Sequence, residues 1–242
     1  ARGELLAAFA LSEPGAGSDL SALEASARLD GDDYVLEGDK RWISFGQIAD
    51  LFLVFARLDG ALAAFLVEPS LAGFTRSPVT GLLGARASQL ADLALRACRV
   101  PREARLGGGR LPFSLVATSA LDLGRYSVAW GCVGLVEACV LASVEHTRAR
   151  RQGGKALADH QLVQRLLTRM ITDARAARLL CAQAATRWDS GDARSLADTM
   201  VAKYFASTAA SRAAADAVQL HGALGCARGA AVERHFRDAK VM

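Results

Sequence analysis

The N-terminal part of the chain alternates between short apolar runs and turn residues. Asp30-Gly31 precedes an apolar run at 34–36, and Asp59-Gly60 separates the runs Leu51–Leu58 and Ala61–Val67. Asp-Gly between apolar runs predicts a hairpin, because glycine accepts the positive φ that tight turns need.

Two more strands are predicted before this pattern changes. One begins at Phe74, and the other covers 93–100 and ends at Pro101. Helical segments do not alternate with the strands, so the pattern favours an antiparallel β-barrel or sandwich over a parallel sheet. We expect this β-domain to occupy residues 1–108.

The chain changes character at 106–109, where three glycines follow a leucine and predict a linker. Apolar residues then recur at helical spacing in three long segments, at about 115–150, 159–188 and 195–220. No heptad pattern is sustained, so these segments predict an up-down helical bundle rather than a coiled coil. The predicted fold class is therefore α+β, with the bundle over residues 109–242.

Composition adds a sizeable core to this picture. Hydrophobic residues make up 52% of the 242 residues, which also argues against disorder. The formal net charge of +4 is spread in mixed-sign patches, so a solvated surface is favoured over a nucleic-acid interface. A basic groove for an anionic ligand, such as a dinucleotide or a phosphopantetheine, is compatible with this charge.

The cysteines indicate a reducing compartment. They are odd in number and form no Cys-x-x-Cys pair, which argues against a disulfide framework and against a metal site. We expect a cytoplasmic protein in which the cysteines pack as small apolar residues. They are Cys98, Cys132, Cys139, Cys181 and Cys226.

No membrane span or signal peptide is predicted. No uninterrupted apolar window approaches the roughly 18 residues that a span needs, and the first residues lack the charged and apolar regions of a signal peptide. The chain also lacks an initiator methionine. We therefore expect it to be processed or to be a fragment.

Two motifs in the predicted β-domain carry candidate ligand contacts. In SEPGAGSD, residues 12–19, the glycines would let backbone approach a ligand and the serines offer hydroxyls, although a plain tight turn is the alternative. In GDKRWIS, residues 38–44, Trp42 and Ile43 alternate along a strand, so one of them faces a cavity or the core. The indole of Trp42 either stacks against a flat ring system or packs in that core.

Three further motifs lie in the predicted bundle. Asp122 and Arg125 share a helix face, where they form either an intrahelical ion pair or a ligand contact. Basic residues at 148–155 precede a helix start at 159–161, which suits a pyrophosphate as well as a solvated charge run. The last motif, 219–225 followed by 232–240, is typical of a glycine-rich helix end and equally of a ligand contact.

The order and spacing of these five motifs resemble the acyl-CoA dehydrogenase family along nearly the whole chain. SEPGAGSD resembles the family's flavin loop, KRWIS the strand whose Trp lies against the isoalloxazine, and LDLGR the acyl-thioester site. RARRQGGK with DHQ resembles the segment that reaches the FAD of a neighbouring subunit. QLHGALG with VERHFRDAK resembles the stretch that holds the adenine end of FAD and leads to the catalytic base.

The resemblance implies FAD as cofactor, an acyl thioester as substrate, and a homo-oligomer, either a dimer or a tetramer. It also implies that the family's N-terminal helical domain is absent from this chain; no electron acceptor is implied. The implied cofactor contacts are Leu11, Ser12, Gly17, Ser18, Trp42, Ser44, Arg150, His160, Gln161, Gln219 and Gly222. The implied substrate contacts are Ser18, Asp122 and Arg125.

Three departures from the family pattern alter the implied FAD contacts. The family's Phe before Gly is Gly153 here, the second Gly of the QLHG motif is Ala223, and the aromatic residue that often follows Gly225 is Cys226.

The run SVAWGCVG, residues 127–134, resembles a particular branch of the family. That branch acts on acyl carrier protein thioesters in polyketide extender-unit pathways, such as those that make methoxymalonyl units, and Gly124 fits it as well. Taken alone, the run predicts helix packing, because small residues allow close approach. Coenzyme A and acyl carrier protein share the pantetheine arm, so both are retained as carriers of the acyl group.

The resemblance implies a dehydrogenation in which a carboxylate removes an α-proton and the β-hydrogen leaves as hydride to the flavin. The family's usual Glu lies shortly after RDAK, beyond Val241-Met242, and its minority position is Gly124 here. No catalytic residue is therefore identified. We expect a fragment of a longer enzyme; a non-catalytic flavin- or thioester-binding module and a flavin-dependent monooxygenase or oxidase are the alternatives.

Overall fold

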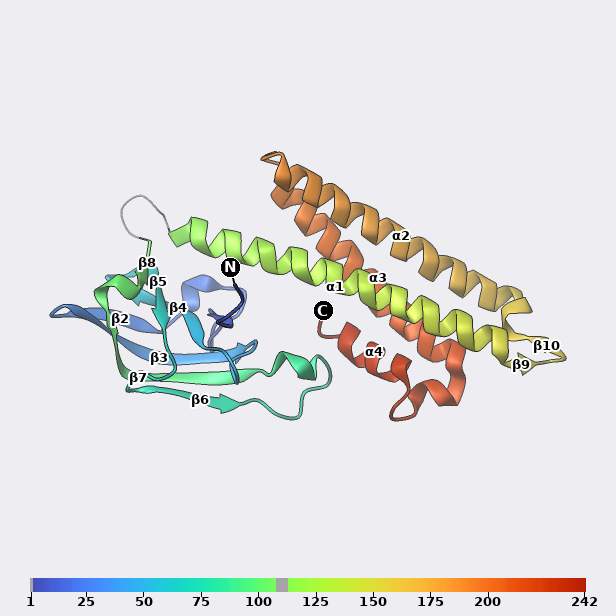
Figure 1. The fold of residues 1–242 in the computed structure, drawn as a ribbon, viewed down its shortest axis with the longest axis horizontal. Coiled ribbons are helices and arrows are strands. Elements are labelled where there is room, and N and C mark those ends of the chain that lie inside the picture. The colour runs from blue at the N-terminus through green and yellow to red at the C-terminus, as the bar shows by residue number, and fades with distance from the viewer. Residues whose placement is uncertain (1, 108–112) are drawn as a thin grey trace. The chain divides into compact units, whose positions relative to one another are not determined.

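The computed structural model describes residues 2–107 and 113–242, with side chains from 117 onward in the second range. Its chain divides into two compact units (Figure 1). The first runs to Leu82 and resumes over Arg86–Ala117, and the second contains Leu83–Ala85 and Thr118–Met242. The domain boundary predicted between 108 and 109 lies outside the described residues, as does part of the predicted linker.

The first unit is built on a mixed sheet of eight strands, in the order β6-β7-β3-β2-β4-β5-β8 with β1 paired to β4. The strands are β1 (Ala7–Ala10), β2 (Ser26–Asp30), β3 (Asp33–Ile43), β4 (Leu51–Leu58), β5 (Ala61–Val67), β6 (Phe74–Pro78), β7 (Ala91–Pro101) and β8 (Arg105–Leu106). Most pairs are antiparallel, but β4 runs parallel to both β1 and β2.

Both predicted hairpins are present. Strands β2 and β3 pair antiparallel from Asp30 opposite Asp33, and Gly31 between them has a φ of 67°. Strands β4 and β5 meet at a turn in which Asp59 and Gly60 have φ values of 50° and 81°. Both central residues of this second turn are therefore left-handed, as expected for Asp-Gly in a two-residue hairpin.

The second unit contains four helices, of which three were predicted. They are α1 (Phe113–Ala149), α2 (Gln161–Asp189), α3 (Ser195–His221) and α4 (Ala231–Ala239). Two short antiparallel strands, β9 (Arg151–Gln152) and β10 (Lys155–Ala156), connect α1 to α2. The fold class predicted from the sequence, a β-domain followed by a helical bundle, is confirmed.

Small side chains fill the core of the bundle. The buried face of α3 is almost entirely alanine, which lets the neighbouring helices approach closely. Cys132, Cys139 and Cys181 are buried in the same cluster, and Cys98 is buried in the sheet. The expectation that Cys226 also packs in a core is wrong: it ends a short 3₁₀-helix beyond α3 and is exposed.

Helix α1 is apolar for much of its length. By length and composition alone, its segment Ala117–Ala149 could cross a membrane, with a mean hydropathy of 1.8. Core helices of soluble proteins meet the same criterion. Glu137 interrupts the apolar run and accepts hydrogen bonds of 2.6 and 2.8 Å from Nη2 of Arg178 on α2. Because Cys132 and Val136 are buried in the cluster shared with α2 and α3, we interpret α1 as a bundle helix.

Candidate cofactor-binding sites

A buried ion pair joins the loop after β1 to the end of β3. Nζ of Lys40 lies 2.6 Å from Oε1 of Glu13, and the two side chains are 0% and 4% exposed. Glu13 also accepts hydrogen bonds from the backbone N–H groups of Glu24, at 2.6 Å, and Ala25, at 3.1 Å. Lys40 donates a second hydrogen bond, of 3.2 Å, to the carbonyl of Leu11. A buried charge needs such partners, because burial alone is costly.

This network holds two of the predicted flavin contacts. The carbonyl of Leu11 accepts from Lys40, and the carbonyl of Ser12 accepts a 2.9 Å bond from the N–H of Arg41. Burial lowers the pKa of the Lys40 ammonium, and the Glu13 carboxylate opposes that shift. The loop and the strand are thus fixed to each other before any ligand binds.

The ion pair was not predicted, although β3 carries a signal for it. Side chains alternate between the two faces of a strand, so Lys40 falls on the same face as Tyr34 and Leu36, which are buried. A lysine on an inward face requires a buried partner, and Glu13 in the SEPGAGSD loop is that partner.

Trp42 is the exposed member of the Trp42–Ile43 pair. Ile43 is 2% exposed and lies in the core, whereas Trp42 is 49% exposed. The register of β3 against β7 shifts between Lys40 and Ile43, and Trp42 adopts a left-handed φ of 61°. Such irregularities re-aim a side chain out of the sheet. The guanidinium of Arg41 lies 4.8 Å from the centre of the indole ring, and the core alternative for Trp42 does not hold.

The other predicted contacts of the β-domain lie at or near the surface. Ser12 is half-buried, while Gly17, Ser18 and Ser44 are exposed. Glu13 and Ala16 exchange backbone hydrogen bonds of 2.9 and 3.2 Å, so the loop contains the tight turn that was the alternative interpretation. Gly17 and Ser18 follow this turn and take no part in its two hydrogen bonds.

Asp122, a predicted substrate contact, is buried on α1 with 4% exposure. Within the described part of the chain its Oδ1 has no hydrogen-bond partner, and it forms no ion pair with Arg125. Burial raises the pKa of this carboxyl, and the charge of Arg125 and the hydroxyl of Thr199 oppose the shift. The intrahelical ion pair is therefore not observed. A cavity of about 270 Å³, lined also by Ser119 and Trp188, adjoins Asp122.

Replacing Asp122 by Asn should stabilise the protein at neutral pH. A carboxyl whose pKa is raised on folding destabilises the folded state once the pH exceeds its ordinary value, so the benefit should vanish toward acid. We expect a gain of about 1 kcal/mol at neutral pH, measured by urea denaturation. The matched control is Asp173→Asn, because Asp173 is also buried but accepts a 2.6 Å bond from Arg212. That variant should lose stability, and a loss in both would contradict the assignment.

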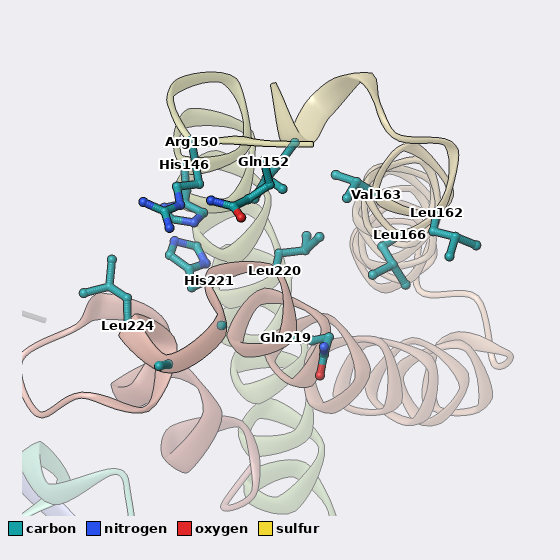
Figure 2. Close-up of a pocket in the computed structure, with 13 residues that line it drawn as sticks. His146, Arg150, Gln152, Leu162, Val163, Leu166, Gln219, Leu220, His221 and Leu224 are labelled. Carbon is teal, nitrogen blue, oxygen red and sulfur yellow. The ribbon is translucent and has the colours of Figure 1, made fainter. Parts of the chain in front are cut away.

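The helical unit contains a cavity of about 680 Å³ between the ends of α1 and α3 and the start of α2 (Figure 2). Three predicted FAD contacts, Arg150, Gln219 and Gly222, line it together. The remaining polar lining comes from His146, Gln152 and His221, and the apolar lining from Leu157, Leu162, Val163, Leu166, Leu220, Ala223 and Leu224. The polar lining is cationic and amide-rich, and Leu162, Val163 and Leu166 of α2 lie across the cavity from the two histidines (Figure 2).

The other two contacts predicted for this region, His160 and Gln161, do not line the cavity. Nε2 of His160 lies 3.1 Å from the carbonyl of Gln152, so the ring braces the β9–β10 turn. Gln161 is exposed at the first position of α2. Gly153 lies in the turn between β9 and β10 and has a φ of 60°.

The cavity also contains a histidine pair that was not predicted. The rings of His146 and His221 stack with centroids 4.3 Å apart and an interplanar angle of 20°. Burial lowers the pKa of His146, and the charges of His221 and Arg150 lower it further. His146 lies one helical turn before Arg150, and this spacing is the signal that would have placed it on the same face.

Leu83–Ala85, a segment of the same unit, holds the RDAK motif at the end of α4. The N–H of Ala85 donates a 2.7 Å bond to Oδ1 of Asp238, and Nη1 of Arg237 donates a 2.8 Å bond to the carbonyl of Leu83. A side chain at Gly84 would lie 2.8 Å from the backbone nitrogen of Asp238, so only glycine allows this approach.

Sequence profiles identify both units. The acyl-CoA dehydrogenase middle domain matches residues 8–98, and the acyl-CoA dehydrogenase C-terminal domain matches residues 114–242. The chain therefore belongs to the acyl-CoA dehydrogenase family, whose members are FAD-dependent oxidoreductases.

Individual relatives align with nearly all of this chain, whereas this chain aligns with only part of each relative. Glutaryl-CoA dehydrogenase of Desulfococcus multivorans is 36% identical over 245 residues, which are 98% of this chain and 62% of the relative. The structure of FkbI, for biosynthesis of the methoxymalonyl extender unit of Fk520, superposes with a TM-score of 0.88 at 38% identity, covering 98% of this chain and 65% of FkbI. The prolyl acyl carrier protein oxidase AnaB gives a TM-score of 0.93 at 29% identity, with coverages of 99% and 64%. The chain thus spans about three-fifths of the length of the curated relatives it matches.

Proposed function

We propose that this chain supplies the flavin- and thioester-binding parts of an FAD-dependent dehydrogenase that oxidises the α,β-bond of an acyl thioester. The observation that carries the proposal is the 680 Å³ cavity, which brings Arg150 from the end of α1 together with Gln219 and Gly222 from the end of α3. One guanidinium, two imidazoles and two amides line it, and no carboxylate does among the described residues. These cationic and amide groups suit a diphosphate, and the apolar side chains of α2 suit an adenine ring.

The residues of this chain would bind and orient the cofactor and the substrate. Bound FAD supplies the hydride acceptor for the oxidation. In the β-domain, the exposed indole of Trp42 offers a flat face, and the Lys40–Glu13 pair holds the loop that carries Leu11 and Ser12. On α1, Gly124 has open space where a side chain would begin and provides no carboxylate. We therefore assign binding and positioning roles to these residues, and we assign the role of catalytic base to none of them.

For the substrate we propose a thioester of acyl carrier protein, as in polyketide extender-unit biosynthesis. The likeness to FkbI and to the prolyl acyl carrier protein oxidase supports this choice, and so does the run 127–134 on α1. The likeness to glutaryl-CoA dehydrogenase supports the alternative, an acyl-CoA. Asp122 and Arg125 are proposed to contact the pantetheine or nucleotide part that either carrier presents.

Anaerobic titration of the full-length flavoprotein tests both parts of this proposal, because the residues assigned above bind and position but supply no base. An acyl thioester should bleach the flavin absorption, and an acyl carrier protein thioester should do so at lower concentration than the same acyl group on coenzyme A. Bleaching by neither would overturn the dehydrogenase assignment. Rapid recolouring by dissolved oxygen would indicate an oxidase on the same fold.

We further propose a cytoplasmic homo-oligomer, a dimer or a tetramer. The cysteines of the two cores are free thiols, which suits a reducing compartment. Large apolar side chains are exposed on the bundle, including Leu162 on α2 and Tyr204 on α3, each at 74%. We propose these side chains as contacts between subunits, because an apolar patch that they contributed to would be covered in an oligomer.

Arg150→Ala should weaken FAD retention. A charge-assisted bond to phosphate is worth about 1.5–3 kcal/mol, which corresponds to a loss of roughly 10- to 150-fold in affinity. Flavin absorbance per protein after extensive dialysis measures the loss. Arg148→Ala is the matched control, because Arg148 is an exposed arginine near the same helix end that does not line the cavity. Equal flavin content in both variants would contradict the role.

A further inference from the structure

We propose that the stacked His146–His221 pair, together with Arg150, is a proton-dependent clamp for the diphosphate group of a dinucleotide. Uptake of a proton by the pair would strengthen anion binding in the 680 Å³ cavity. The inference rests on the proposed function and adds to it a dependence of cofactor binding on pH. It concerns two residues that the sequence motifs did not assign.

One hydrogen bond fixes the tautomer and the orientation of the His221 ring. Nδ1 of His221 lies 2.7 Å from the carbonyl of Ala217. A carbonyl only accepts, so Nδ1 carries a hydrogen, which leaves Nε2 outside this bond. The ring is thereby locked against rotation while it stacks on His146 at 4.3 Å. Figure 2 shows both rings beside the side chain of Arg150 at the same end of the cavity.

Arg150 is the one charged side chain beside the pair in the described lining of the cavity. From the end of α1 comes Arg150, and the β9 strand presents the amide of Gln152. Helix α2 presents only Leu162, Val163 and Leu166, and the 3₁₀-helix after α3 presents glycine, alanine and leucine. Among the described residues of the lining there is no carboxylate that could stabilise an added proton.

No negative charge in the described lining balances Arg150, so a bound anion would change the electrostatic environment of the pair. Burial, His221 and Arg150 each lower the pKa of His146, so this imidazole resists protonation when no anion is near. A diphosphate would remove that repulsion and raise the pKa. Binding would then take up a proton, and by linkage the affinity rises as the pH falls through the interval between the free and bound pKa values. Within that interval the change approaches about tenfold per pH unit, and outside it the affinity is flat.

Calorimetric titration of the flavin-free protein with FAD, at about pH 6 and about pH 8, tests the clamp in a range where imidazoles titrate. We expect affinity for FAD to be about tenfold higher at the lower pH, with proton uptake that appears as a dependence of the heat on buffer ionisation. ADP and coenzyme A, which carry a diphosphate, should show the same trend, and riboflavin, which carries none, should not. His146→Gln/His221→Gln should bind FAD with no such trend.

The controls separate this inference from the proposed function. His235→Gln removes an imidazole that does not line the cavity, and it should keep the wild-type pH dependence. A double variant with the wild-type pH dependence would overturn the clamp while leaving FAD binding intact. No FAD binding at either pH would instead overturn the proposed function. If the double variant does not fold, absence of proton uptake by the wild-type protein is sufficient to reject the clamp.

Discussion

Lys40→Met should destabilise the protein by about 3–5 kcal/mol, because it leaves the buried Glu13 carboxylate without its cation. Methionine fills a similar volume, so the loss reports the charge rather than a cavity. Two backbone N–H groups still donate to Glu13, which places the expected value toward the lower end of that range. Urea denaturation at neutral pH measures the change in the free energy of unfolding.

A matched exposed pair shows that burial, not the ion pair itself, produces this cost. Asp39 and Arg96 also lie 2.6 Å apart, but their side chains are 50% and 54% exposed. Asp39→Asn should therefore cost no more than about 1 kcal/mol. Lys40→Met combined with Glu13→Gln should recover much of the stability, because no buried charge is then left alone. Equal losses in Lys40→Met and Asp39→Asn would show that Glu13 is not effectively buried.

Lys40→Met should also loosen the loop that carries Leu11 and Ser12. The carbonyl of Leu11 loses its buried donor when Lys40 is replaced, while the bond from Arg41 to Ser12 remains. The loop should then hold its predicted ligand-facing groups less rigidly. Reduced flavin content in Lys40→Met at a temperature where the variant is still folded would connect the ion pair to cofactor binding.

Local patterns were sufficient to predict most elements of the fold. The Asp59-Gly60 turn and the ends of β4 and β5 follow from backbone preferences within a few residues, and the long helices follow from apolar spacing. The parallel pairing of β4 with β1 and β2 was not predicted, because strand order is decided by contacts between segments distant in sequence. Helix α4 is short and its pattern was taken for part of a motif rather than an element.

The candidate site was predicted in parts. Arg150, Gln219 and Gly222 line one cavity, as a shared role requires. The spacing of His146 from Arg150 could have placed both on one face of α1, but nothing in that segment indicates that α3 brings His221 against His146. For Asp122 the spacing along the helix was misleading. It permits an ion pair with Arg125, but the side chain is buried beside Thr199 on α3. Spacing along a helix defines which residues can meet, and packing between helices decides which do.

Gly73→Ala should destabilise the protein by about 3–5 kcal/mol, more than a left-handed backbone alone explains. Gly73 has a φ of 82°, and a side chain there would collide with the carbonyl oxygen of Arg96 and lie 3.2 Å from Cα of Cys98. Gly73 also accepts a 2.8 Å bond from the N–H of Arg96, so the turn cannot withdraw without losing a link to β7.

Gly60→Ala is the matched control for this substitution. Gly60 has a φ of 81°, but nothing lies within 4 Å of the position that a side chain would take. Its cost should be the conformational part alone, about 1–2 kcal/mol, and the difference between the two variants isolates the collision. The two should also differ in flavin content: β7 supplies Asp92, whose carboxylate accepts the N–H of Trp42 at 3.2 Å. Displacing β7 would move that residue, so loss of flavin in Gly73→Ala but not in Gly60→Ala would support Trp42 as a flavin contact, and equal loss of stability in both would reject the collision.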